Sequence, residues 1–117
     1  ETRIRAFVAE HLHGQATSAG HSGWEPISPD TLAREAHLSP DHFSRRWKAT
    51  TGLTPEQFLH QARLTLAREL LLTDQFTISQ VADRTGFSDH SYFSLQFKQR
   101  FGLSPREYML HHLARAS

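Results

Sequence analysis

A pattern in the first half of the chain recurs in the second half, and this repeat limits the possible folds more than any other feature. The pattern Phe-x3-Trp-Lys-x3-Gly-Leu-x-Pro-x2-Phe begins at Phe43 and returns 50 residues later from Phe93, with Phe for Trp and Tyr for the last Phe. Upstream, residues 32–39 resemble residues 81–88 at an offset of 49, which predicts one inserted residue just after Ser88. The chain must therefore build one supersecondary unit twice.

Capping signals divide the chain into seven helices, and strand signals are nearly absent. The starts are marked by a hydroxyl residue before Pro, or by Thr-x-x-Gln and Ser-x-x-Glu boxes. We expect an all-α fold with helices at about 2–13, 29–37, 40–50, 55–73, 78–85, 89–101 and 105–115. Residues 14–27 are expected to form a loop, from which Trp24 and Ile27 can fold back on the core.

Each copy has the layout of a helix-turn-helix: a short helix, a tight turn and a longer second helix. Residues 37–39 and 86–88 supply the turns, and the small Ala33 and Ala82 let the paired helices cross closely. The predicted organisation has three parts. Residues 1–54 contain the first helix, the loop and the first helix-turn-helix, and residues 55–73 form a long connecting helix. Residues 74–117 contain the second helix-turn-helix and the C-terminal helix.

The second helix of such a motif lies in the major groove of DNA, so its outward face should carry polar and basic groups. On a helical wheel of the first copy, Phe43, Trp47 and Thr50 fall on the core side. The opposite side carries a first outer stripe, which consists of Asp41, Arg45 and Lys48 with Ser44 at its flank.

The second copy follows the same plan with one difference. Phe93, Phe97 and Arg100 share the inner half of the wheel. The second outer stripe consists of Ser91, Leu95 and Lys98. It is polar or basic except at Leu95.

The formal net charge of +1 hides an uneven distribution along the chain. Residues 39–54 carry three basic residues against one acidic, and residues 77–104 carry three against two. Residues 1–38 carry three basic residues against five acidic. Positive charge thus gathers on the two helix-turn-helix segments, as nucleic-acid binding requires.

Three other functions are weighed against DNA binding. The nine His residues form no metal-binding pattern, since His11 and His13 diverge on a helix, and the absence of Cys excludes thiolate sites. We therefore predict no metal and no cofactor. No nucleophile elbow, phosphate loop or paired-carboxylate pattern indicates an enzyme. A helix-turn-helix that binds only protein is the remaining alternative, and Leu95 is its best argument.

Over residues 28–109, the sequence resembles the DNA-binding domain of the AraC/XylS family of bacterial transcription regulators. The most specific part is Ile-x2-Val-Ala-x3-Gly-Phe-Ser-Asp-x-Ser-Tyr-Phe-x3-Phe-Lys-x3-Gly-Leu-Ser-Pro-x2-Tyr, from Ile78 to Tyr108. The connecting helix adds Arg-Leu-x2-Ala-x2-Leu-Leu from Arg63. The resemblance implies two recognition helices that read adjacent major-groove segments of a promoter operator.

The resemblance also assigns contacts. The base contacts are expected from Asp41, Ser44 and Arg45 in the first unit and from His90, Ser91 and Leu95 in the second. Phosphate contacts are expected from Lys48, Lys98, Ser28 and Thr77, the last two through backbone N–H groups at helix starts. Leu95 departs from the family pattern, which usually has Arg or another polar residue there.

The partners that the resemblance implies are double-stranded DNA, RNA polymerase, and an N-terminal effector or dimerisation domain outside this chain. The chain is accordingly expected to be the C-terminal part of a longer regulator in the bacterial cytoplasm. No signal peptide is recognisable in the first residues, and no apolar run is long enough to span a membrane.

Overall fold

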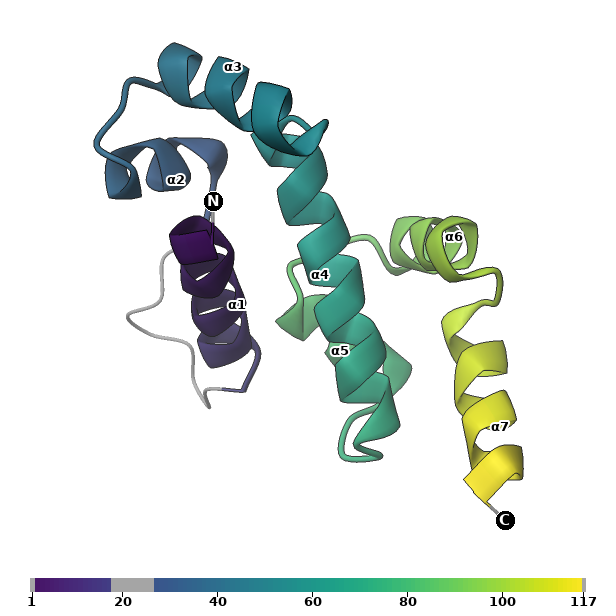
Figure 1. Cartoon of the computed structure of the whole chain (residues 1–117). Coiled ribbons are helices and arrows are strands. Elements are labelled where there is room, and N and C mark those ends of the chain that lie inside the picture. The colour runs from purple at the N-terminus through teal and green to yellow at the C-terminus, as the bar shows by residue number, and fades with distance from the viewer. Residues whose placement is uncertain (1, 18–26, 117) are drawn as a thin grey trace. The chain divides into compact units, whose positions relative to one another are not determined.

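The computed structural model describes residues 2–17 and 27–116, with side chains described as far as Leu113. All secondary structure in these ranges is helical, which confirms the predicted all-α class (Figure 1). The helices are α1 (Thr2–Thr17), α2 (Pro29–Glu35), α3 (Pro40–Thr51), α4 (Pro55–Leu72), α5 (Ile78–Arg84), α6 (His90–Phe101) and α7 (Pro105–Ala116). Within these ranges, no helix combines the length and apolar character needed to cross a membrane.

The chain divides into two compact units, residues 1–62 and 63–117, and the boundary falls inside α4. The first unit contains α1, α2, α3 and the beginning of α4. The second contains the rest of α4 with α5, α6 and α7. Each unit thus holds one copy of the repeat and builds its own core.

Aromatic packing forms the core of the first unit. The Trp47 ring stacks on Phe43 and meets Phe58 edge-on, with ring centroids 5.6 and 5.0 Å apart. The Arg5 guanidinium of α1 lies 5.8 Å from the Trp47 ring and 5.2 Å from the Phe58 ring. Such contacts between a cation and an aromatic ring stabilise by about 0.5–2 kcal/mol. They fix α1 against the helices that carry the repeat.

The second unit has an equivalent core in which Phe replaces Trp. Phe93 and Phe97 are fully buried on α6, and their ring centroids lie 5.8 Å apart. Tyr108 of α7 meets Phe97 edge-on, as Phe58 meets Trp47 in the first unit. The equivalence in packing confirms that the sequence repeat is a structural repeat.

Helix boundaries differ most from expectation at α1. The helix continues through Gly14 to Thr17, so the predicted loop at 14–27 is wrong in its first four positions. Ala16 is fully buried, and its packing outweighs the helix-breaking tendency of Gly14. Ile27 is buried as predicted, whereas Trp24 lies outside the described residues.

Two inner positions of the helical wheel are also wrong. Thr50 and Arg100 are exposed rather than part of the core. Each lies in the last turn of its helix, beyond the buried aromatic residues of that helix. The Thr50 hydroxyl donates to the Arg46 carbonyl oxygen, and the Arg100 guanidinium lies 5.6 Å from the Phe101 ring.

Candidate nucleic-acid interface

The turns of the two units have the same backbone hydrogen bonds. In the first, the N–H groups of residues 36, 37 and 38 donate to the carbonyls of residues 32, 34 and 33. In the second, those of residues 85, 86 and 87 donate to the carbonyls of residues 81, 83 and 82. Every bond is displaced by 49 residues, as the sequence offset predicts. The two turns therefore begin with the same backbone geometry.

A left-handed residue occupies the same place in both turns. Its φ is +58° at His37 and +92° at Gly86. Only glycine adopts this conformation without steric cost. Gly86 is also close to Arg63, since a Cβ atom there would lie 3.4 Å from the Arg63 Nε. Partial burial of the Arg63 guanidinium lowers the pKa of Arg63.

Side-chain caps begin the second helices and place the inserted residue. Ser39 accepts a hydrogen bond from the His42 N–H at the start of α3, and Asp89 accepts one from the Tyr92 N–H at the start of α6. Asp89, not Ser88, is thus the counterpart of Ser39. The insertion is Ser88 itself rather than the residue after it, and it lengthens the second turn.

The structure brings the first outer stripe together on the exposed side of α3. Asp41, Arg45 and Lys48 are exposed, and Ser44 is half-buried at their flank. Within the described residues, the side chains of Arg45 and Lys48 make no hydrogen bond or ion pair, and Asp41 forms no ion pair with Arg45. The cations of this stripe are therefore available to a ligand.

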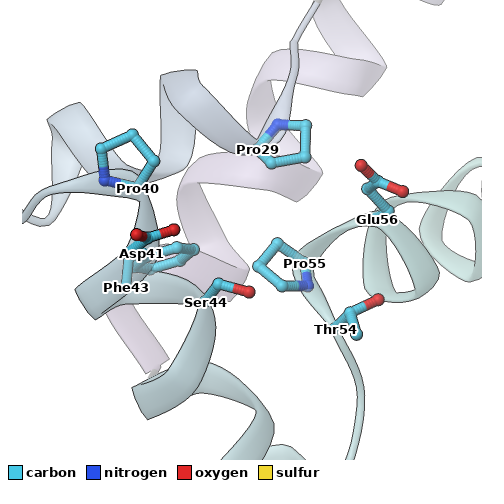
Figure 2. Close-up of a pocket in the computed structure, with 8 residues that line it drawn as sticks. All are labelled: Pro29, Pro40, Asp41, Phe43, Ser44, Thr54, Pro55 and Glu56. Carbon is cyan, nitrogen blue, oxygen red and sulfur yellow. The ribbon is translucent and has the colours of Figure 1, made fainter.

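An open pocket of about 330 Å³ lies beside this stripe, within the first unit. Figure 2 shows Asp41 and Ser44 on one side of it, with Thr54, Pro55 and Glu56 from the start of α4 on the other. Pro29 and Pro40 complete its wall, and Phe43 lies beneath. Two exposed carboxylates at the rim repel phosphate, so we assign no phosphate to this pocket.

The second outer stripe likewise lies on the exposed side of α6. Ser91 and Lys98 are exposed, and Leu95 retains 55% of its accessible surface. These residues are on the opposite side of α6 from the buried Phe93 and Phe97. Ser91, Leu95 and Lys98 therefore share one surface of α6.

His90 is already engaged. Its Nε2 lies 2.8 Å from the Asp83 Oδ1, and both side chains are exposed. The contact joins the last turn of α5 to the first residue of α6 across the turn. Sequence reasoning missed this pair, although the seven-residue spacing over a tight turn is the signal that could have found it.

Three arginines of the second unit are turned toward aromatic rings. The Arg84 guanidinium lies 4.6 Å from the Phe76 ring centroid. Arg100 and Arg68 lie 5.6 and 4.7 Å from the Phe101 ring centroid. Of the three basic residues in 77–104, Arg84 and Arg100 thus contact aromatic rings. Lys98 is the basic residue of the second outer stripe.

Capping boxes at Ser28 and Thr77 already bind some of the backbone N–H groups at these helix starts. The Ser28 hydroxyl accepts from the Thr31 N–H, and the Thr77 hydroxyl accepts from the Gln80 N–H. Reciprocal bonds satisfy the N–H groups of Ser28 and Thr77 themselves. Any phosphate at these helix starts would therefore meet the N–H groups that follow the cap.

Another capping box begins α7, where the Ser104 N–H donates to the Glu107 Oε1 over 3.0 Å. Hydrogen bonding by Ser104, through its backbone and then its side chain, lowers the pKa of Glu107, and the nearby charge of Lys98 adds to this effect. Among the described residues, no three His, Asp or Glu side chains gather where they could hold a metal ion.

Two helix-turn-helix units with exposed polar and basic second helices define a class of nucleic-acid-binding domains. A family described as "Helix-turn-helix domain" matches residues 32–111. The chain belongs to this family, the DNA-binding domains of AraC/XylS transcription regulators.

Named relatives agree with this assignment. The chain is 37% identical over 83 residues to the HTH-type transcriptional activator RhaS of Escherichia coli strain SE11, which is 71% of this chain and 30% of the relative. RhaS proteins of other Escherichia coli strains match equally. The chain therefore spans less than a third of the length of these curated relatives.

Solved structures share the fold. The DNA-binding domain of AdpA, solved in complex with a target DNA, is 32% identical with a TM-score of 0.78, over 97% of this chain and 93% of that one. The C-terminal domain of AraT, a response regulator from Geobacillus stearothermophilus, is 28% identical with a TM-score of 0.72, over 94% and 83%.

Proposed function

We propose that this domain binds double-stranded promoter DNA in a sequence-specific manner and regulates transcription, with α3 and α6 as its recognition helices. The observation that carries the proposal is the pair of outer stripes. Each lies on the exposed side of a second helix whose opposite side is buried aromatic core. The relative AdpA, whose DNA-binding domain is solved on a target DNA, supports the same use of this fold.

In the first unit, we assign base contacts to Asp41, Ser44 and Arg45. The Arg45 guanidinium suits the two acceptors of guanine, O6 and N7, which it can engage with two hydrogen bonds. Asp41 suits the amino group of cytosine, since a carboxylate can only accept. The Ser44 hydroxyl is able to donate or accept and therefore adds a contact of low selectivity.

In the second unit, we assign base contacts to His90, Ser91 and Leu95. His90 approaches DNA either by leaving Asp83 or through its other ring nitrogen, because Nε2 is held by that carboxylate. This pairing also fixes the imidazole ring, which lowers the conformational cost of a contact.

Phosphate contacts position the domain without reading sequence. We assign them to Lys48 and Lys98, each in the last turn of its recognition helix, and to the backbone at the helix starts near Ser28 and Thr77. Few phosphates are neutralised by such a set. Non-specific affinity should therefore be modest, and base contacts must supply much of the discrimination.

We further propose that α4 serves as the connecting helix between the parts 1–54 and 74–117. In the whole regulator, this domain would act with an effector or dimerisation domain and with RNA polymerase, in the bacterial cytoplasm. The length of the RhaS relatives supports additional domains, since the match covers only 30% of them.

The decisive experiment is a selection of bound sequences from a random duplex library by the purified chain, followed by titration of the selected operator by fluorescence anisotropy at two salt concentrations. Enrichment of one motif and preference for that duplex over a scrambled one support the proposal. Equal weak binding of all duplexes would instead favour a domain that binds only protein.

A further inference from the structure

The two recognition helices carry different chemistry at the same position of the repeat. Position 45 of the first unit corresponds to position 95 of the second, since the Gly-capped ends of α3 and α6 are also displaced by 50 residues. The first of these positions is Arg45 and the second is Leu95. The Arg side chain ends in five N–H donors, whereas the Leu side chain has no polar atom.

Leu95 lies where a ligand of α6 must meet it. Ser91 precedes it by one turn and Lys98 follows by one turn, and both are exposed on the same stripe. Tyr92, which is 48% exposed, lies at its other flank. A single exposed Leu is ordinary on a protein surface, but this one occupies the centre of a polar, basic stripe.

The chemistry of the major groove offers one partner for such a side chain. Each base pair presents donors and acceptors there, and the only apolar group among them is the 5-methyl group of thymine. A Leu side chain leaves donors and acceptors without partners, which is costly when water is excluded. It gains free energy only by contact with the methyl group.

We propose that Leu95 reads a thymine in the second subsite of the operator through the thymine 5-methyl group. The inference rests on the proposed function and specifies it further. The two helix-turn-helix units thus recognise different groups on the bases: Arg45 binds hydrogen-bonding atoms, and Leu95 contacts a methyl group. The operator is consequently asymmetric between its two subsites.

The test removes only the methyl group. In the selected operator, each thymine is replaced singly by deoxyuridine, and dissociation constants are measured for the unaltered chain and for Leu95→Ala. One thymine should respond with a loss of about 4-fold for the unaltered chain, the value of one buried methyl group. Leu95→Ala should bind the thymine operator about 4-fold more weakly and should no longer distinguish thymine from uracil at that position.

Two further variants sharpen the result. Lys98→Ala should weaken binding to both operators by the same factor, so discrimination against uracil persists. Leu95→Arg, which installs the side chain of position 45, should change the preferred base at that position from thymine toward guanine in a new selection.

The outcomes separate this inference from the proposed function. If no sequence is enriched, the proposed function fails and the inference fails with it. If an operator is enriched but no thymine-to-uracil change affects binding, or if Leu95→Ala keeps the discrimination, only the assignment of Leu95 is overturned.

Discussion

His37 and Gly86 adopt the same left-handed backbone conformation at equivalent points of the two helix-turn-helix units. Only the second unit has the residue that tolerates this conformation, with φ of +92° at Gly86 and +58° at His37. The backbone hydrogen bonds of the first turn, which match those of the second turn, hold His37 in this conformation although it has a side chain. The same turn conformation thus has two causes. In the second unit glycine adopts it readily, and in the first unit the surrounding hydrogen bonds impose it.

Gly86→Ala should destabilise the fold by about 1–2 kcal/mol, because an L side chain is strained at positive φ. The new Cβ would also come into van der Waals contact with the Arg63 side chain, 3.4 Å from its Nε, so the backbone strain accounts for the loss. Chemical denaturation followed by circular dichroism measures the loss. Gly86→Asn is the matched control and should lose less, since Asn tolerates the left-handed region better than Ala. Equal stability of Gly86→Ala and the unaltered chain would contradict this account.

His37→Gly should leave stability unchanged or raise it by up to about 1 kcal/mol, because the relief of strain is partly offset by the greater freedom of glycine in the unfolded chain. The same denaturation experiment applies. A marked loss would show that the exposed His37 side chain makes a stabilising contribution that its backbone conformation does not reveal.

Arg45→Ala should weaken binding to the selected operator by about 1–3 kcal/mol and relax the preference at one base pair. Arg45→Lys should recover little, because a lysine cannot form the paired hydrogen bonds of a guanidinium. The control is Arg46→Ala, which removes the same charge from the adjacent exposed position of α3. Equal effects of the Arg45 and Arg46 substitutions on base preference would refute the proposed orientation of this helix.

Lys98→Ala should weaken binding to all sequences and reduce the slope of log K against log salt by about one. The reason is the loss of one neutralised phosphate, with no effect on base readout. Titrations of specific and scrambled duplexes over a range of salt concentrations measure the slope. Arg100→Ala provides the comparison, and it should change the slope less because its guanidinium lies over the Phe101 ring.

Glu107→Gln should change how stability depends on pH. The lowered pKa of Glu107 means that the ionised carboxylate stabilises the folded chain above the ordinary glutamate value of 4.5, and that this contribution is lost as the pH falls through the folded pKa. Gln keeps the capping bond, as Gln57 does with the Thr54 N–H. Because Gln has no charge, the variant should be less stable than the unaltered chain at neutral pH and should lose less stability on acidification.

Thermal unfolding between neutral and acidic pH checks this prediction. Glu56→Gln is the control, since Glu56 also lies in the first turn of a helix but makes no capping hydrogen bond within the described residues. This control should retain the acid sensitivity of the unaltered chain. A Glu107→Gln variant with unchanged acid sensitivity would contradict the assigned role of the carboxylate.

Much of the fold could be predicted because its signals are local. Caps such as Ser39 and Thr77 act within one turn of the chain, and the repeat requires that whatever forms once forms twice. The extension of α1 to Thr17 could not be predicted, because the burial of Ala16 depends on tertiary packing that the local sequence does not describe. Similarly, the helical wheel places Arg100 inward, although it is exposed in the last turn of α6.

The sequence could predict which residues lie on the exposed surface of the recognition helices, but not the contacts of their side chains. The helical periodicity of apolar residues located Arg45 and Leu95 on the outer side of their helices. The contact of His90 with Asp83 depends on side-chain geometry across a turn, which periodicity does not describe. Likewise, counting charges could not show that Arg84 faces the Phe76 ring.

The placement of Trp47 in the core of the first unit has a practical result for spectroscopy. Both tryptophans of the chain belong to residues 1–62 and both tyrosines to residues 63–117. Excitation at the red edge of the indole band therefore reports on the first unit alone, and the emission should shift to longer wavelength when water reaches the buried Trp47. The tyrosine contribution to the absorbance, after subtraction of the tryptophan contribution, follows the second unit. Two wavelengths thus distinguish concerted from stepwise unfolding in the unmodified protein.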